Sequence, residues 1–193
     1  MGVAENAVIE NIKSRRSVRE YTDEDVSDED IKTIIDAGIH APSGFDSQPW
    51  FFVVVKNREM MKRMSDHCKP RLLAMLDEAT NDAAMEFKKE LADEEFHIFY
   101  DAPVLIIVLG NNASVTADID CSLCAENMML AAHSMDIGSC WIGTGCFIQD
   151  NPELLEELGI TPDYRVIAPI IFGYPAKEYH ETEKREPEVV WVD

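Results

Sequence analysis

The sequence is poor in basic residues and has no apolar run long enough to cross a bilayer. Its 17 Lys and Arg residues stand against 37 Asp and Glu residues, which gives a formal net charge of -20. Such a charge repels nucleic-acid backbones and anionic lipid surfaces, so we expect binding to neither. A spanning helix needs about 20 consecutive apolar residues. The opening stretch "MGVAENAVIENIKS" also lacks the apolar segment of a secretion signal, which indicates a cytoplasmic protein.

Several familiar enzyme motifs are absent as well. The sequence contains no P-loop, HExxH or GxSxG pattern, and its glycines at 138–146 do not have dinucleotide-binding spacing. The five cysteines, an odd number, indicate reduced thiols in the absence of a secretion signal. Cys121, Cys124, Cys140 and Cys146 allow a zinc module as an alternative. We expect no metal, because the first pair has helical spacing in an apolar segment and the second pair is five residues apart.

The composition is that of a folded domain, with 46% hydrophobic and 28% charged residues. A chain of 193 residues can bury one core, so we expect a single domain, 1–193. Periodicity and turn residues predict helices at 5–16, 57–67, 71–99 and 116–135, and strands at 50–56, 103–110 and 164–175, the last interrupted by Pro169. Ser27 as N-cap and an apolar stripe of Ile31, Ile34, Ile35 and Ile39 predict a further helix that stops before residue 41. Strands and helices without regular alternation predict an α+β sandwich.

The predicted helix at 116–135 is apolar on nearly every side. Leu123, Met128 and Leu130 lie at positions that share no single face, so the helix has no obvious solvent-exposed side. One domain of this size would hardly cover such a helix alone. We therefore expect a second subunit to supply part of the cover.

The stretch "SRRSVRE" brings three arginines together in an otherwise acidic chain. Guanidinium groups donate paired hydrogen bonds and keep their charge, so Arg15, Arg16 and Arg19, with Ser17 between them, suit a phosphate group. Each pair at about 4 Å is worth roughly 4 kcal/mol before desolvation is subtracted. The alternative is that these arginines simply interact with the carbonyl end of a helix.

Two further stretches suit a ligand. "APSGFDSQPW", directly before the predicted strand 50–56, forms a bent ledge that carries Ser43, Asp46 and Gln48, although a loop that caps itself is the commoner case. "GSCWIGTGC" follows the long apolar helix, and its glycines let the backbone approach a ligand closely.

Taken in order, four stretches resemble the nitroreductase family of FMN-dependent oxidoreductases. They are "RRSVREY", "APSGFDSQPWFFVVV", "DCSLCAENMMLAAHSMDIGSCWIG" and "APIIFGYPAKE", spread over about residues 12 to 187. The resemblance implies an α+β fold with a central, mostly antiparallel sheet flanked by helices, in an intertwined homodimer with FMN at the subunit interface. It also implies ping-pong transfer of hydride from NADH or NADPH to a flat, electron-poor acceptor such as a nitroaromatic or a quinone.

The same resemblance implies roles for individual residues. Arg15, Arg16, Ser17 and Arg19 would hold the phosphate, ribityl and pyrimidine parts of FMN, and Arg185 would add a phosphate contact. Pro42, Ser43, Gly44, Asp46 and Gln48 would reach the flavin from the partner subunit. Ile142, Gly143 and Thr144 would pass along the flavin, with a backbone amide near Gly143 facing the reactive N5. No side chain is implied as acid or base, because the cofactor carries the chemistry.

The sequence departs from the family pattern at three positions. Asp46 stands where Asn is usual and can only accept hydrogen bonds when ionised. Glu126 replaces a frequent Gln, and Glu183 stands where some members carry a second basic phosphate ligand. We also expect a helical cover segment at about 68–99 and a C-terminal arm at about 176–193. The cover segment matches no part of the family pattern, so the sequence does not identify the electron acceptor. The alternatives are a flavin-holding or sensing protein with little turnover, and a flavin reductase, enone reductase or dehalogenase on the same scaffold.

Overall fold

The computed structural model describes residues 6–78 and 81–192. The helices are α1 (Ala7–Ser14), α2 (Asp28–Ile39), α3 (Arg58–Met75), α4 (Asp82–Ala92), α5 (Ala117–Ser134) and α6 (Pro152–Glu157), with the 3-10 helices η1 (Gly44–Asp46) and η2 (Gly143–Asp150). The strands are β1 (Trp50–Val55), β2 (Val104–Asn111), β3 (Gly138–Trp141) and β4 (Tyr164–Gly173). They form one antiparallel sheet in the order β1-β2-β4-β3, so the α+β prediction is confirmed.

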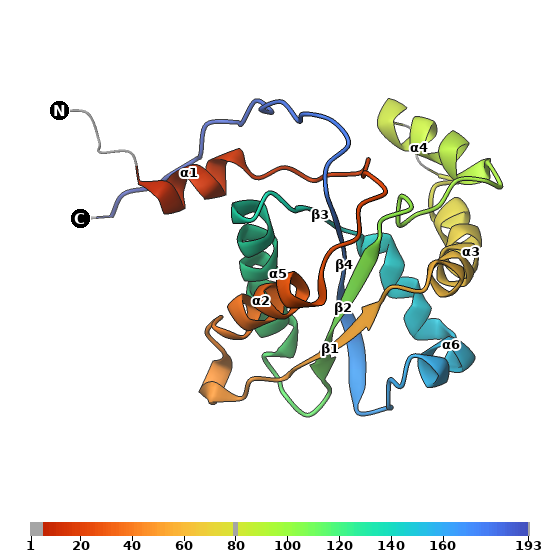
Figure 1. Ribbon diagram of the computed structural model, residues 1–193, viewed down its shortest axis with the longest axis horizontal. Helices are drawn as coiled ribbons and strands as arrows, with labels where there is room; N and C mark the ends of the chain where they lie inside the picture. The colour runs from red at the N-terminus through yellow and green to blue at the C-terminus, as the bar shows by residue number, and fades with distance from the viewer. Residues whose placement is uncertain (1–5, 79–80, 193) are drawn as a thin grey trace.

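The central strand β2 divides the core in two. Its sequence, "VLIIVLGN", is buried on both sides of the sheet, and successive side chains point to opposite faces. Leu105, Ile107 and Leu109 therefore pack into one apolar cluster, while Val104 and Ile106 pack into the other. Helices cover both faces of the sheet (Figure 1).

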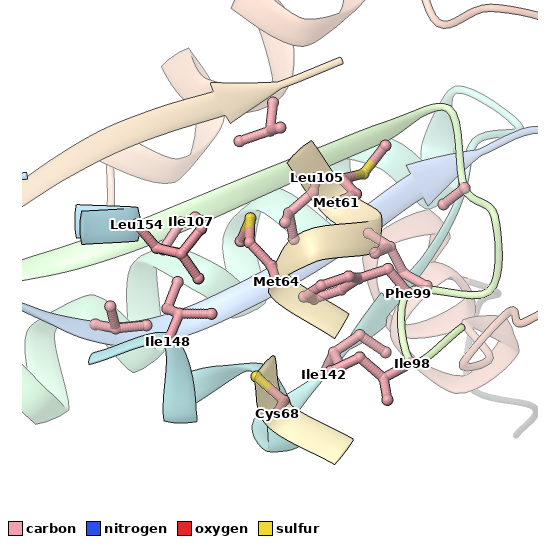
Figure 2. Close-up of a cluster of buried hydrophobic side chains, with 14 of the residues drawn as sticks. Met61, Met64, Cys68, Ile98, Phe99, Leu105, Ile107, Ile142, Ile148 and Leu154 are labelled. Atoms are coloured by element: carbon pink, nitrogen blue, oxygen red, sulfur yellow. The ribbon is translucent and has the colours of Figure 1, made fainter. Parts of the chain in front are cut away.

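The first cluster lies between the sheet and α3. Met61 and Met64 on α3 lie beside Leu105 and Ile107 of β2, and Cys68 lies farther along α3 in the same cluster (Figure 2). Side chains from η2 and α6 complete this cluster. Buried apolar side chains of this size each contribute roughly 1.5–3 kcal/mol, so this face is a major source of stability.

The second cluster lies under α2 and α5. These helices approach closely at Gly38, where a Cβ atom would lie 2.6 Å from Met128 Cγ. The helix at 116–135 is confirmed as α5, and the cover that the chain itself gives it is incomplete. Ile119 is 66% exposed and Leu123 is 42% exposed, so an apolar strip of α5 faces outward.

The structure corrects three sequence predictions and adds one strand. The helix predicted at 57–67 continues to Met75, with Pro70 inside it. The single helix predicted at 71–99 is instead the end of α3 and the separate α4, followed by turns, and residues 79–80 lie outside the described residues. Pro169 does not interrupt β4: it pairs with Ile107, and the register shifts beside it because Ile167 has no partner on β2. The edge strand β3 was not predicted, because four residues that include Gly138 carry no strand-like run of apolar residues.

The cysteines and the helices bear on the predictions about a metal site and a membrane-spanning segment. All five cysteines are free, and burial raises the pKa of Cys121 and Cys124 to about 12. Residues 6–78 and 81–192 contain no group of three or more His, Cys, Asp and Glu side chains placed to hold a metal ion. The described helices include none that is both long and apolar enough to cross a membrane.

The contact between β3 and the arginine-rich stretch generates a first prediction. A Cβ atom on Gly138 would lie 2.7 Å from Cγ2 and 2.8 Å from Cβ of Val18. We expect Gly138→Ala to lower the free energy of unfolding by about 1–3 kcal/mol, because the added carbon overpacks this contact. Gly143→Ala is the matched control for stability, because a Cβ there meets only Trp141 Nε1, at 4.0 Å. Equal midpoints for the two variants in urea unfolding would contradict the close packing.

Candidate functional site

The arginine-rich stretch lies between the edge strand β3 and the chain that follows β4. Ser17 forms a parallel bridge with Ser139, where Val18 N–H donates to the Ser139 carbonyl at 3.0 Å. Farther along, Ala176 N–H donates to the Glu20 carbonyl at 2.9 Å. We call residues 15–20 the arginine segment. Backbone pairing on both sides fixes its position.

One cavity, of about 210 Å³, opens beside the first half of this segment. We call it the arginine cavity. Its polar lining comes from Ser14, Arg15, Arg16, His133, Asp136, Ser139, Lys177, Glu178 and Tyr179. Among the described residues, Ser139 Oγ is the one buried side-chain nitrogen or oxygen atom that lacks a hydrogen-bond partner. Buried polar atoms are normally hydrogen-bonded, so a free hydroxyl here indicates a missing partner.

The two arginines of this cavity differ in what they contact. Arg15 Nε lies 3.9 Å from Glu126 Oε1, a long and partly exposed ion pair that adds little stability. Arg16 donates to the carbonyls of Lys13, Arg15 and His180. Arg16 therefore interacts with carbonyls near the end of α1, as the alternative interpretation of the arginines predicted. The positive charge of Arg15, in contrast, has only the distant carboxylate of Glu126 to balance it.

His133, near the end of α5, also faces the arginine cavity. Its Nε2 lies 2.8 Å from Ser14 Oγ. Burial, followed by the positive charge of Arg15, lowers the pKa of His133. An anion bound in this cavity would favour the protonated form of the ring.

A second cavity, of about 540 Å³, opens beside the other half of the segment. We call it the aromatic cavity. It is lined by Arg19, Ala83, Phe87, Glu90, Ile98, Tyr100, Trp141, Ile142, Gly143 and Thr144. Arg19 Cζ lies 5.8 Å from the centre of the Tyr100 ring. The volume is within the roughly 300–1,000 Å³ range of small-molecule sites, and the aromatic lining suits a flat ring. The structure thus brings Arg19 together with Ile142, Gly143 and Thr144.

The ledge before β1 has an unusual backbone. Phe45, Asp46 and Gln48 have φ angles of 55°, 54° and 41°, in the left-handed region that side chains rarely adopt. Phe45 is also 95% exposed. Gln48 Nε2 donates to Asp46 Oδ1 at 2.9 Å, which uses Asp46 as a hydrogen-bond acceptor. Backbone of this kind persists only where its surroundings hold it, and it concentrates at functional sites.

Asp120 of α5 holds the ledge in place. This carboxylate is buried, accepts from Gly44 N–H at 3.1 Å and also accepts from the Thr116 hydroxyl at 2.7 Å. Ser43 Oγ accepts from Gln48 N–H at 3.1 Å. The ledge is therefore a fixed surface, held by one buried acid and its own side chains.

One chain does not bring all of the predicted residues together. The ledge lies beyond the end of α2, while the arginine segment follows α1 on the opposite side of the molecule (Figure 1). Pro42, Ser43, Gly44, Asp46 and Gln48 line neither cavity. Arg185 is exposed in the chain after β4 and lines neither cavity. The predicted residues thus fall into a first group that lines the two cavities and a second group on the ledge. Ser17 pairs with Ser139 but lines neither cavity, and Arg185 lies apart from both groups.

Sequence reasoning missed several residues that shape these features. Ser139 and His133 carry no motif, and only the fold brings them beside the arginine segment. Tyr179 lies far along the chain from the residues it contacts. Asp120 did have a signal, because a buried acid within an otherwise apolar helix calls for a partner.

The comparisons with known proteins agree with this geometry. The chain is 34% identical over 176 residues to a protein of Archaeoglobus fulgidus whose name suggests an NADH dehydrogenase or NAD(P)H nitroreductase, with 90% of each chain covered. It is 28% identical to a Bacillus subtilis protein named FMN reductase, with 89% of this chain and 67% of that protein covered.

Solved structures give the same result. A Bacteroides fragilis nitroreductase with bound FMN is 30% identical and superposes with a TM-score of 0.80, covering 98% of this chain and 100% of that one. The model of the nitroreductase family matches residues 12–174, which include the arginine segment, the ledge and the cavity-lining residues Ile142, Gly143 and Thr144. The chain belongs to the nitroreductase family.

Proposed function

We propose that the protein is an FMN-dependent oxidoreductase that passes hydride from NADH or NADPH to a flat, electron-poor acceptor such as a nitroaromatic or a quinone. The observation that carries this proposal is that one arginine segment lines two adjacent cavities, one cationic and one aromatic. A ligand with a phosphate at one end and a flat ring at the other matches that pair. The names of the relatives support the same reading.

The residues of the arginine cavity fit a phosphate. Arg15 offers a weakly matched charge, and Ser139 offers a buried hydroxyl without a partner. Anions bind most strongly to charged donors in partly desolvated sites. Arg15, Arg16 and Ser17 would therefore hold the phosphate and ribityl end, and Arg185 would join them from the arm of the chain.

The residues of the aromatic cavity fit the flavin ring. Bound FMN supplies hydride transfer through its N5. Arg19 would bind the pyrimidine edge, and the backbone at Ile142, Gly143 and Thr144 would line the ring, with the amide near Gly143 facing N5. The space beside Gly143 is open, because a Cβ there would meet only one atom within 4 Å. The chain thus orients its ligands, and no side chain is assigned as acid or base.

A second copy of the chain would complete the site. The ledge is fixed, exposed and remote from the cavities within one chain. Apolar side chains without cover lie on α1, on α5 and in the C-terminal arm, where Trp191 is 85% exposed. Packing these surfaces together in a homodimer would remove them from water and carry the ledge of each copy to the cavities of the other. We place this dimer in the cytoplasm, where the five free thiols would stay reduced.

Turnover separates this proposal from a protein that only holds or senses flavin. We expect oxidation of NADH or NADPH with a quinone or a nitroaromatic to run faster than with the same concentration of free FMN. Because donor and acceptor would use one open space in turn, double-reciprocal plots at several acceptor concentrations should give parallel lines. Rates no higher than those of free FMN would favour the flavin-holding alternative.

Arg15 tests the assigned phosphate end. We expect Arg15→Ala to weaken FMN binding about 10- to 100-fold, because one charge-assisted contact contributes roughly 1.5–3 kcal/mol. Quenching of flavin fluorescence during titration of apoprotein measures the dissociation constant. Lys89→Ala is the control, because Lys89 is an exposed cation on α4 that lines neither cavity. Equal affinities for the two variants would count against the assigned cavity.

Mixed dimers test whether two chains share each site. Arg15→Ala damages the cavity group, and Ser43→Arg damages the ledge group, so each variant alone should lose FMN. When the two are co-expressed, each mixed dimer would contain one site with neither change. Purification through two different tags isolates the mixed dimers, so flavin absorbance should show about one half of their sites filled. Absence of this recovery would place both groups in the same chain's site.

A further inference from the structure

Tyr179 makes an unusual contact with the arginine segment. Its hydroxyl oxygen accepts from the backbone N–H of Arg19 at 2.9 Å and from the N–H of Glu20 at 3.0 Å. In an extended strand, successive N–H groups point to opposite sides. One oxygen reached by both therefore marks a local bend of the backbone at residues 19 and 20.

This bend lies where the arginine segment passes from one cavity to the other. Arg15 and Arg16 line the arginine cavity, and Arg19 lines the aromatic cavity. Tyr179 itself lines the arginine cavity. The Tyr179 hydroxyl therefore binds the backbone of the arginine segment next to Arg19, between the residues that line the two cavities and the residues that follow.

Other contacts keep the Tyr179 hydroxyl in this place. Lys177 Nζ lies 5.7 Å from the centre of the Tyr179 ring, and the same ammonium pairs with the Glu20 carboxylate. Next to Tyr179, the carbonyl of His180 accepts from Arg16 Nε at 3.0 Å. The chain after β4 is therefore bound to the arginine segment on both sides of the bend.

We propose that Tyr179 is a positioning residue for the flavin site: its hydroxyl holds the bend at Arg19 and Glu20 and so directs the arginines toward the two ends of the cofactor. This inference rests on the proposed function, because it assumes that these cavities bind FMN. It adds that the chain after β4 determines cofactor affinity through one phenolic oxygen. Without that oxygen, the two N–H groups lose their acceptor and the segment becomes free to straighten.

The test compares Tyr179→Phe with Tyr174→Phe. The control removes a hydroxyl from the same stretch of chain, and the Tyr174 hydroxyl makes no hydrogen bond within residues 6–78 and 81–192. For Tyr179→Phe we expect the dissociation rate of FMN to rise about 10-fold, because the arginine segment becomes free to straighten and its arginines contact the cofactor less well. The visible absorption spectrum of the bound flavin should also change, because Arg19 is displaced. Tyr174→Phe should match the wild type in both measurements.

Amide exchange gives a second measurement that needs no cofactor. In wild-type apoprotein, the N–H groups of Arg19 and Glu20 should exchange with deuterium more slowly than exposed amides, and in Tyr179→Phe they should exchange at the exposed rate. Fast exchange of these amides in the wild type would overturn the inference even if the variant failed to fold.

The outcomes separate the inference from the proposed function. Wild-type protein that fails to bind FMN would overturn both. Wild-type protein that binds FMN, with a Tyr179→Phe variant that melts at a lower temperature but has the same dissociation rate and flavin spectrum, would overturn the inference alone. In that case the hydroxyl would stabilise the fold and would not position the arginines.

Discussion

The site depends on the backbone pairing of the arginine segment with the edge strand β3. The bridge between Ser17 and Ser139 places the cationic residues against β3, an edge strand, on the side opposite its partner β4. Gly138 permits that approach, because a side chain there would collide with Val18. From this pairing follow both the cavity that contains Arg15 and the cavity that contains Arg19.

The same pairing resolves an electrostatic conflict. A net charge of -20 opposes any anionic ligand, and Glu126, Asp136, Glu178 and Glu181 all lie near the arginine cavity or its arginines. Within the cavity, however, burial and short distances strengthen local interactions relative to the diffuse charge of the surface. Burial is the main cause of the lowered pKa of His133, and the positive charges of Arg15 and Arg16 act in the same direction. The acidic surface would then repel anions in general, while the short-range interactions inside the cavity would still allow an anion to bind there.

The sequence predicted what depends on local pattern. Long apolar runs predicted β1, β2 and β4, and the Ser27 cap with its apolar stripe predicted α2. It could not predict β3, because a short edge strand with glycine is defined by its neighbour on β4 rather than by its own residues. For the same reason it could not place Ser139 or Tyr179, whose roles come from contacts between segments more than a hundred residues apart in sequence.

The backbone of the ledge supports the proposal that a second chain completes the site. Each left-handed residue there costs about 1–3 kcal/mol, and a buried Asp120 is committed to holding the loop. Within residues 6–78 and 81–192 the outer surface of the ledge has no partner at Phe45, which is almost fully exposed, and the ledge lines neither cavity. A folded protein keeps such strain where the shape serves a contact. In the proposed dimer that contact is the flavin of the opposite copy, so cofactor binding and subunit association would each stabilise the other.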